Sequence, residues 1–204
     1  MNVIRSSLIY SLFTSISRVF GFLRDILIAN FLGTGVIADI FFVAFRLPNT
    51  FRRIFSEGAL NSAFVPIYTK LIKDNLSHES KKFSGSIFLI FLVASSLVVL
   101  IIEVFMPSFV AILAPGFTND DDKFNELVEV SRIIFPFLIL ISISSIFSSI
   151  LNSHNKFALS AALPIILNIT LIIALITAAY TAADFLTFLS WSVIVAGLLQ
   201  IVFL

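Results

Sequence analysis

Six long apolar runs organise this sequence and leave few residues for anything else. A helix needs about 20 mainly apolar residues to cross the hydrocarbon core of a bilayer. Charged residues make up only 12% of the chain, against about 25% in a soluble domain. We therefore predict an all-α, polytopic membrane helix bundle with about six transmembrane helices. The runs cover residues 4–31, 36–60 with an extension to 71, 83–106, 127–151, 157–180 and 185–204.

The basic residues of the connecting segments predict the orientation of the chain, because Lys and Arg are enriched in cytoplasmic loops. Every second connection is basic, whereas the connections between them carry only Lys123, which lies beside three aspartates. The N-terminus is therefore predicted to be cytoplasmic, and six spans would return the C-terminal end to the same side. The basic residues are Arg5, Lys70, Lys73, Lys81, Lys82 and Lys156.

Charged side chains inside the first two runs are the strongest functional signal. Such a residue costs about 2.5–3.5 kcal/mol at the bilayer centre on insertion scales, so it usually faces a partner or a wet cavity. In the first run, polar or small residues recur every three or four positions, which places them on one helix face. We expect that face to line a cavity, with Pro48 bending the second helix beside Asn49. The charged residues are Arg18, Arg24, Asp25, Asp39, Arg46, Arg52, Arg53 and Glu57.

The excess of arginine over acid in this region favours an anionic ligand. The fork of donors on a guanidinium group matches the oxygens of phosphate. We therefore predict that Arg18, Arg24 and Arg52 bind a lipid phosphate or pyrophosphate, with Asp25 orienting an arginine from another helix. Two interpretations stay open for Arg46, Arg53 and Glu57, which are as compatible with structural ion pairs or interfacial snorkelling as with a binding role.

Enzyme and metal chemistry find no support in the sequence. There is no cysteine, and His78 and His154 lie in predicted loops away from any carboxylate cluster. A phosphate-cradling glycine loop, an HExxH motif and a nucleophile elbow are all missing. We expect no catalytic residue, no metal and no cofactor, and a net charge of +1 gives no reason to expect nucleic acid.

Other polar residues in the runs are interpreted as structural. Serine side chains commonly support close helix packing in membranes, and we interpret the serines of the fourth run in this way. Pro136, and Pro164 with Asn168, predict kinks in the fourth and fifth runs. The serines are Ser142, Ser144, Ser145, Ser148 and Ser149.

Several stretches of the sequence resemble the MurJ (MviN) family, the lipid II flippases of bacterial cell-wall synthesis, within the multidrug/oligosaccharidyl-lipid/polysaccharide exporter superfamily. The most specific are SRVFGFLRD at 17–25 and ADIFFVAFRLPNTFRRIFSEGALNSAFVPIY at 38–68. APGF at 114–117, FPFLILISISSIFSSILNSHNKF at 135–157 and P-x-x-x-N at 164–168 also match. Together these stretches extend the resemblance over essentially the whole chain.

The resemblance implies a longer protein with two six-helix lobes and an extra helix pair, of which residues 1–204 are the N-terminal lobe. The apolar run that is still open at Leu204 favours the same expectation. Such a protein flips lipid II, an undecaprenyl-pyrophosphate-linked disaccharide-pentapeptide, from the inner to the outer leaflet of the cytoplasmic membrane by alternating access. Because no nucleotide site is visible, membrane potential or an ion gradient is the expected energy source.

Carried over by resemblance, the substrate-binding residues are Arg18, Arg24, Asp25 and Arg52. Asp39, Asn49, Arg53 and Glu57 match positions with a secondary role in the cavity or in gating. Lipid II and membrane lipids are the implied partners, with cell-wall synthesis proteins as further candidates. Two alternatives remain: an exporter of another anionic polyprenyl-linked glycan, and a non-transporting lobe that only binds lipid or partner proteins.

Overall fold

The chain folds into a bundle of helices. The computed structural model describes residues 3–33, 35–52, 60 and 62–204, with side chains from residue 8 onward except that of residue 52. No strand occurs among these residues. The helices are α1 (Val3–Leu32), α2 (Val36–Arg52), α3 (Val65–Lys73), α4 (Ser77–Val104), α5 (Met106–Leu113), α6 (Asp121–Ile134), α7 (Phe137–Ser153), α8 (Phe157–Thr181) and α9 (Phe185–Phe203), with a 3-10 turn at Pro115–Phe117.

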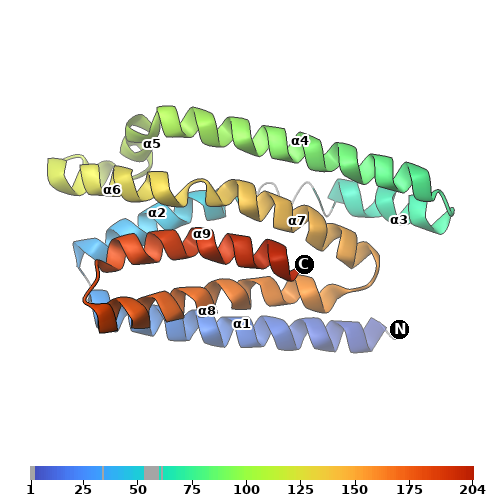
Figure 1. Ribbon diagram of the computed structural model, residues 1–204, viewed down its shortest axis with the longest axis horizontal. Helices are drawn as coiled ribbons and strands as arrows, with labels where there is room; N and C mark the ends of the chain where they lie inside the picture. Colours follow the sequence, from blue (N-terminus) through green and yellow to red (C-terminus); the bar gives the residue numbers. More distant parts are fainter. Residues whose placement is uncertain (1–2, 34, 53–59, 61) are drawn as a thin grey trace.

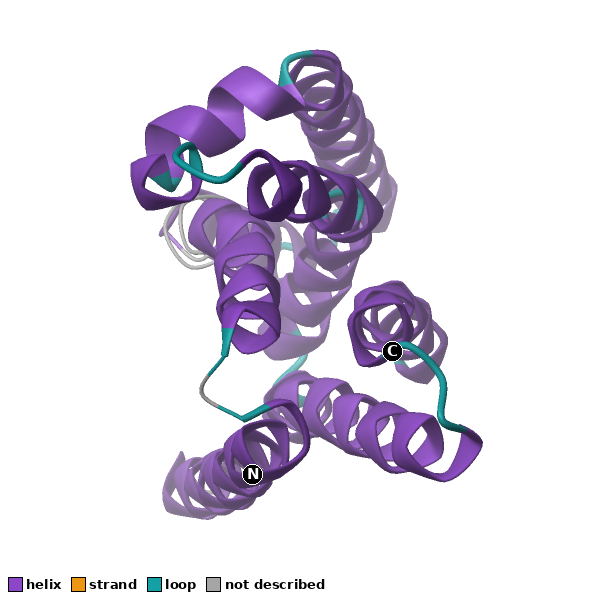
Figure 2. Cartoon of the chain, turned by 90° about the vertical axis from the view of Figure 1, so that its left-hand side faces the viewer, coloured by secondary structure: helices purple, strands orange, loops and turns teal. Residues whose placement is uncertain are grey.

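The long helices run side by side along one direction (Figure 1). α1 packs mainly on α8, and α8 in turn packs on α9. In the other part of the bundle, α2 packs on α6 and α4 packs on α7. An end-on view shows α1, marked N, at the edge of the bundle (Figure 2). The helix with the predicted arginines is therefore held chiefly by one neighbour, α8.

Four helical segments are long and apolar enough to cross a membrane: α4, the continuous stretch Asp121–Ser153 that contains α6 and α7, α8, and α9. They correspond to the last four predicted runs. α1 has 30 residues but carries the intramembrane charges, and α2 is described over 17 residues. The predicted all-α membrane bundle is confirmed, and the order of its helices follows the six apolar runs.

The sequence predicts that basic and non-basic connections alternate between the two ends of the bundle, and the structure shows this arrangement. Figure 1 places the N-terminus, the α3–α4 turn and the α7–α8 turn at one end of the bundle. The α1–α2, α5–α6 and α8–α9 connections lie at the other end. All the basic connections thus share one end, as the sequence predicts. That this end faces the cytoplasm stays a prediction.

Two acidic caps fix helices at the end opposite the basic connections. Asp184 accepts hydrogen bonds from the backbone N–H groups of Thr187 at 2.9 Å and Leu186 at 3.4 Å, at the start of α9. The hydrogen bonds from Thr187 hold the pKa of the Asp184 carboxyl below its usual range. Asp120 caps α6 in the same way and pairs with Lys123 at 2.7 Å, and its hydrogen bonds with Lys123 lower its pKa. Both carboxylates therefore stabilise their helices in the ionised form.

At Pro136, where the sequence predicts a kink, the structure interrupts the helix between α6 and α7. It also adds elements that the sequence did not predict. Pro136 lies between α6 and α7, where Leu138 N–H donates to Phe135 and Ile139 N–H donates to Pro136, each at 3.0 Å. Such bonds to the third residue back tighten the chain where proline cannot donate. The short α5 and the turn that follows it were not predicted. α2 is described as far as Arg52, and α3 begins at Val65. The predicted extension of the second run to residue 71 crosses residues 53–59 and 61, which lie outside the described residues.

Candidate functional site

A polar cavity of about 560 Å³ lies between α1, α2, α7, α8 and α9. Hydroxyl and amide side chains form most of its wall. Arg18 is the one charged residue among its described lining residues, which include no carboxylate. The cavity therefore offers one cation and many neutral hydrogen-bonding groups. These polar neighbours are Tyr10, Thr14, Ser17, Asn49, Ser144, Ser145, Ser148, Ser149, Asn152, Ser160 and Gln200.

The predicted polar face of the first helix is only partly the cavity wall. Thr14 and Arg18 lie on that face and line the cavity. Gly21, one turn further, faces Asn168 of α8 instead. Asp25 is exposed and is not a lining residue. The first part of this polar face therefore lines the cavity, and the part around Gly21 packs against α8.

Arg18 keeps its charge available. In the part of the chain that the structure describes, it forms no ion pair and no side-chain hydrogen bond. Arg18 is exposed and lies at the cavity wall, so a ligand that enters the cavity can reach its guanidinium group. An unpaired Arg18 in a polar cavity is therefore suited to an anionic ligand.

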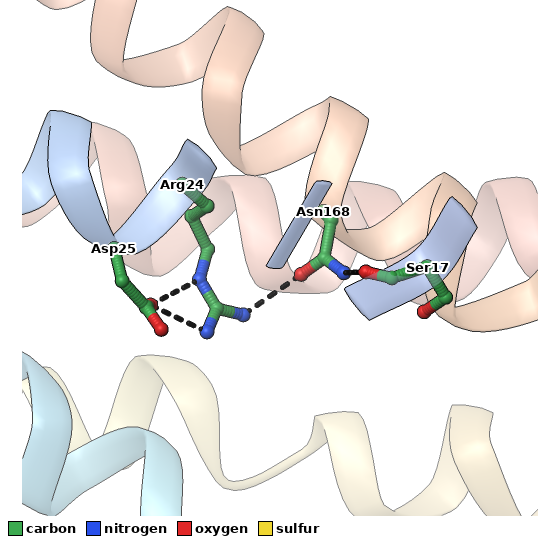
Figure 3. Close-up of polar contacts among 4 residues, drawn as sticks. All are labelled: Ser17, Arg24, Asp25 and Asn168. Atoms are coloured by element: carbon green, nitrogen blue, oxygen red, sulfur yellow. Dashed lines mark hydrogen bonds and ion pairs between the residues drawn. The ribbon is translucent and has the colours of Figure 1, made fainter. Parts of the chain in front are cut away.

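Arg24 forms a different arrangement from the one predicted (Figure 3). Its Nη2 and Nε donate to Asp25 Oδ1 at 2.7 and 3.0 Å. Its Nη1 donates to Asn168 Oδ1 at 2.8 Å, and Asn168 Nδ2 donates to the backbone carbonyl of Ser17 at 3.1 Å. Among the described residues Asp25 bonds to the arginine next to it. Its predicted role in orienting an arginine from another helix stays a prediction, because the side chains of Arg52 and Arg53 lie outside the described residues. The pair of Arg24 and Asp25 lies beside the cavity, linked to it through Asn168 and Ser17.

Burial distinguishes the two members of this pair. The Arg24 side chain is 17% exposed, whereas that of Asp25 is 52% exposed. Asn168 is buried, so its amide would lose hydrogen bonds to water that only a protein partner replaces. Arg24 and the Ser17 carbonyl supply these partners. Asn168 therefore fixes the guanidinium direction and joins α8 to α1 at the same point.

Of the remaining predicted residues, one lines the cavity, two are exposed outside its lining, and the others are not fully described. Asn49 lines the cavity, and its Nδ2 donates to the Phe45 carbonyl at 3.1 Å. Asp39 and Arg46 are exposed and are not among the lining residues. The Arg52 side chain and the whole of Arg53 and Glu57 lie outside the described residues. The roles predicted for all these residues stay predictions.

Sequence reasoning missed the wall that α7 contributes. The serines of the fourth run were interpreted as packing residues, yet four of the five line the cavity. Their positions 144, 145, 148 and 149, continued by Asn152, repeat with the helical period and share one face. The same pattern was used for the first run, so the signal was present. Gln200 of α9 was also missed; its Nε2 donates to the Leu163 carbonyl at 2.8 Å.

Comparison with known proteins identifies a family for this chain. The family model described as lipid II flippase MurJ matches residues 28–204. A probable lipid II flippase MurJ of Rhizobium tropici is 42% identical over 189 residues, which cover 91% of this chain and 36% of the relative. A probable lipid II flippase MurJ of Rickettsia prowazekii is 38% identical over 204 residues, covering 100% of this chain and 40% of the relative.

Comparison of the fold with solved structures identifies the same family. A solved structure of lipid II flippase MurJ in an inward closed conformation has a TM-score of 0.73 and 27% identity, covering 96% of this chain and 40% of that one. The chain spans 36 to 40% of the length of the relatives named here. The family model begins after Arg24, but the Rickettsia match covers the arginine-bearing helix as well. With sequence and fold in agreement over nearly all of its length, this chain belongs to the lipid II flippase MurJ family.

Proposed function

We propose that this chain forms the N-terminal lobe of a transporter that moves lipid II from the inner to the outer leaflet by alternating access. The observation that carries the proposal is the cavity that holds an unpaired Arg18 among hydroxyl and amide groups. Relatives that match 91 to 100% of the chain bear the name of lipid II flippase. Lipid II combines a pyrophosphate with sugar and peptide groups, so it requires both cations and neutral hydrogen-bonding partners.

In this proposal Arg18 and Arg24 share the pyrophosphate. Arg18 provides a free guanidinium from the cavity wall. Arg24 donates to both Asp25 and Asn168, and it would exchange one of these partners for a phosphate oxygen. Arg52, one turn beyond Asn49 on the sequence of α2, is the third proposed ligand. Together the arginines would compensate the charge that the substrate brings into the membrane.

Rocking of this lobe against a second lobe would expose the headgroup to the other side, while the prenyl tail stays in lipid. The chain would lie in the cytoplasmic membrane with its basic end in the cytoplasm. Moving one elementary charge across the membrane changes the free energy by about 2.3 kcal/mol per 100 mV. Membrane potential can therefore bias a state with uncompensated arginine.

The test is replacement of Arg24 by alanine in the full-length protein of a strain that depends on it. We expect cell-wall synthesis to stop while the protein is still made and inserted. Arg46→Ala is the matched control, because Arg46 lies on α2 but is exposed and away from the cavity lining. Normal growth of the Arg24→Ala strain would contradict the proposal.

A further inference from the structure

A second cleft, of about 630 Å³, lies at the basic end of the bundle. It is bounded by α3, by the C-terminal end of α7 and by the start of α8. Figure 1 shows α3 and the α7–α8 turn at this end of the molecule. None of the residues that line the cavity with Arg18 belongs to this cleft except Asn152. It is therefore a separate feature that the proposed transport site does not use.

The lining of the cleft has two chemical parts. Val65, Ile72 and Phe157 form an apolar surface, whereas Lys73 and His154 supply a cation and an imidazole. Thr69, Ser153 and Asn155 add neutral polar groups. No carboxylate is found among the lining residues that the structure describes. Such a cleft fits a ligand with an anionic head and an apolar tail.

The side chains of Lys73 and His154 are both accessible to a ligand. Lys73 forms no ion pair among the residues described. The His154 ring packs edge-on against Tyr68, with centroids 6.1 Å apart and planes at 80°. This packing orients the imidazole while leaving it exposed. Lys70 and Lys156 are further basic residues in the same two segments of the sequence.

The position of the cleft along the bundle indicates which part of the bilayer surrounds it. Two membrane-capable helices begin here, α4 at Ser77 and α8 at Phe157. The cleft therefore lies where the spans enter the bilayer, at the depth of the phospholipid headgroups. Basic pockets between helices at this depth bind the headgroups of anionic lipids.

We propose that this cleft binds an anionic phospholipid of the surrounding leaflet. Its phosphate contacts Lys73 and His154, and its acyl chain lies on Val65, Ile72 and Phe157. The bound lipid joins α3 to the α7–α8 turn. The proposal does not depend on lipid II transport, because the cleft and the arginine cavity use different charged residues.

The experiment measures thermal unfolding of the full chain, stripped of lipid in a nonionic detergent and titrated with dioleoyl-phosphatidylglycerol. We expect saturable stabilisation of the unaltered chain. Lys73→Gln should weaken the apparent affinity about fivefold, since each lysine near an anionic lipid surface contributes a factor of this order. His154→Gln should weaken it as well. Lys81→Gln is the matched control, because Lys81 is exposed at the same end but does not line the cleft.

Two further arms make the result decisive. Dioleoyl-phosphatidylcholine tests the headgroup charge, and inorganic phosphate tests the lipid tail. Equal stabilisation by both lipids, or equal affinity of the Lys73→Gln and Lys81→Gln variants, would overturn the proposal. Phosphate that reproduces the whole shift would overturn the assignment to a lipid. A phosphatidylglycerol with a photoreactive acyl chain should label peptides of α3 and the start of α8; labelling confined to other helices would contradict the site.

Discussion

Arg24 and Asn168 join α1 to α8 across 144 residues of sequence, through a hydrogen bond of 2.8 Å from Nη1 to Oδ1. The same amide also donates to the Ser17 carbonyl, so one buried side chain holds both the backbone of α1 and its arginine. A helix that must carry charge into a membrane is thereby fixed to the neighbour on which it mainly packs. The direction of the Arg24 guanidinium group therefore depends on this pair.

Replacing Asn168 by leucine should loosen α1 and misdirect Arg24. The change leaves Nη1 of Arg24 without its acceptor, while the bonds to Asp25 remain. It also removes the only side-chain donor that reaches the Ser17 carbonyl among the described residues. Loss of a buried hydrogen-bonding partner costs about 1–3 kcal/mol of stability. Thermal unfolding of the purified chain measures this. Asn168→Asp, which keeps an acceptor for Arg24, should lose less; equal losses would show that the bond to Arg24 contributes nothing.

The role of the α7 serines in the cavity can be tested with two serine-to-alanine substitutions, of which only one removes a residue that lines the cavity. Ser142 and Ser145 each donate to the carbonyl four residues back at 2.7 Å, but only Ser145 lines the cavity. Ser145→Ala should therefore weaken lipid II binding about two- to tenfold, the value of one ordinary hydrogen bond. Ser142→Ala should leave binding unchanged. Binding to the purified chain by native mass spectrometry distinguishes them, and equal affinities would return the α7 serines to a packing role.

Gly197 of α9 lies tightly against α7. A Cβ at this position would lie 2.8 Å from Leu140 Cδ1 and 2.9 Å from both Leu140 Cβ and Phe137 Cδ2. Gly197→Ala should therefore destabilise the chain by about 1–3 kcal/mol, the usual cost of overpacking. Gly85→Ala in α4 is the control, because nothing lies within 4 Å of its Cβ. That change should be neutral or stabilise slightly through helix propensity, and a similar loss in both would contradict the packing.

Asp184 predicts a pH dependence at the start of α9. Because its folded pKa is lowered by the hydrogen bonds from Thr187, its contribution is present above the unfolded pKa and is lost as the pH falls through the folded value. The unfolded pKa of an aspartate is about 3.9. The stability difference between the unaltered chain and Asp184→Ala should thus be constant near neutral pH and shrink below about pH 4. A difference that does not change down to pH 2 would show that the charge of the cap is irrelevant.

Much of the fold was predictable because it depends on properties that are local in sequence. Apolar run lengths place α1, α4, α8 and α9 within a few residues of their observed bounds, except where α4 begins earlier through a polar first turn at Ser77. Pro136 marks a break because proline cannot donate a backbone bond. The short α5 escaped prediction because eight apolar residues fit the end of a span as well as a separate helix.

The site was harder to predict because it depends on which helices meet. The sequence indicates that Arg18 faces inward, but it does not indicate that α7 supplies the opposite wall. Asp25 was assigned a partner on another helix because it lies two turns from Arg18, about 10 Å along the helix axis. Neighbouring residues on one helix point about 100° apart, but the long side chain of Arg24 still reaches the Asp25 carboxylate. Pairing of this kind is decided by side-chain reach and by the position of Asn168.

The most direct test of the central claim is lipid II binding to the purified chain in nanodiscs by native mass spectrometry. The unaltered chain is compared with Arg18→Ala, with the Arg18/Arg24/Arg52→Ala variant and with Arg46→Ala. We expect Arg18→Ala to lose about 10- to 150-fold in affinity, the range for a hydrogen bond to a charged group. The triple variant should not bind, and Arg46→Ala should bind normally. Equal binding by all four chains would contradict the assignment of the pyrophosphate to these arginines.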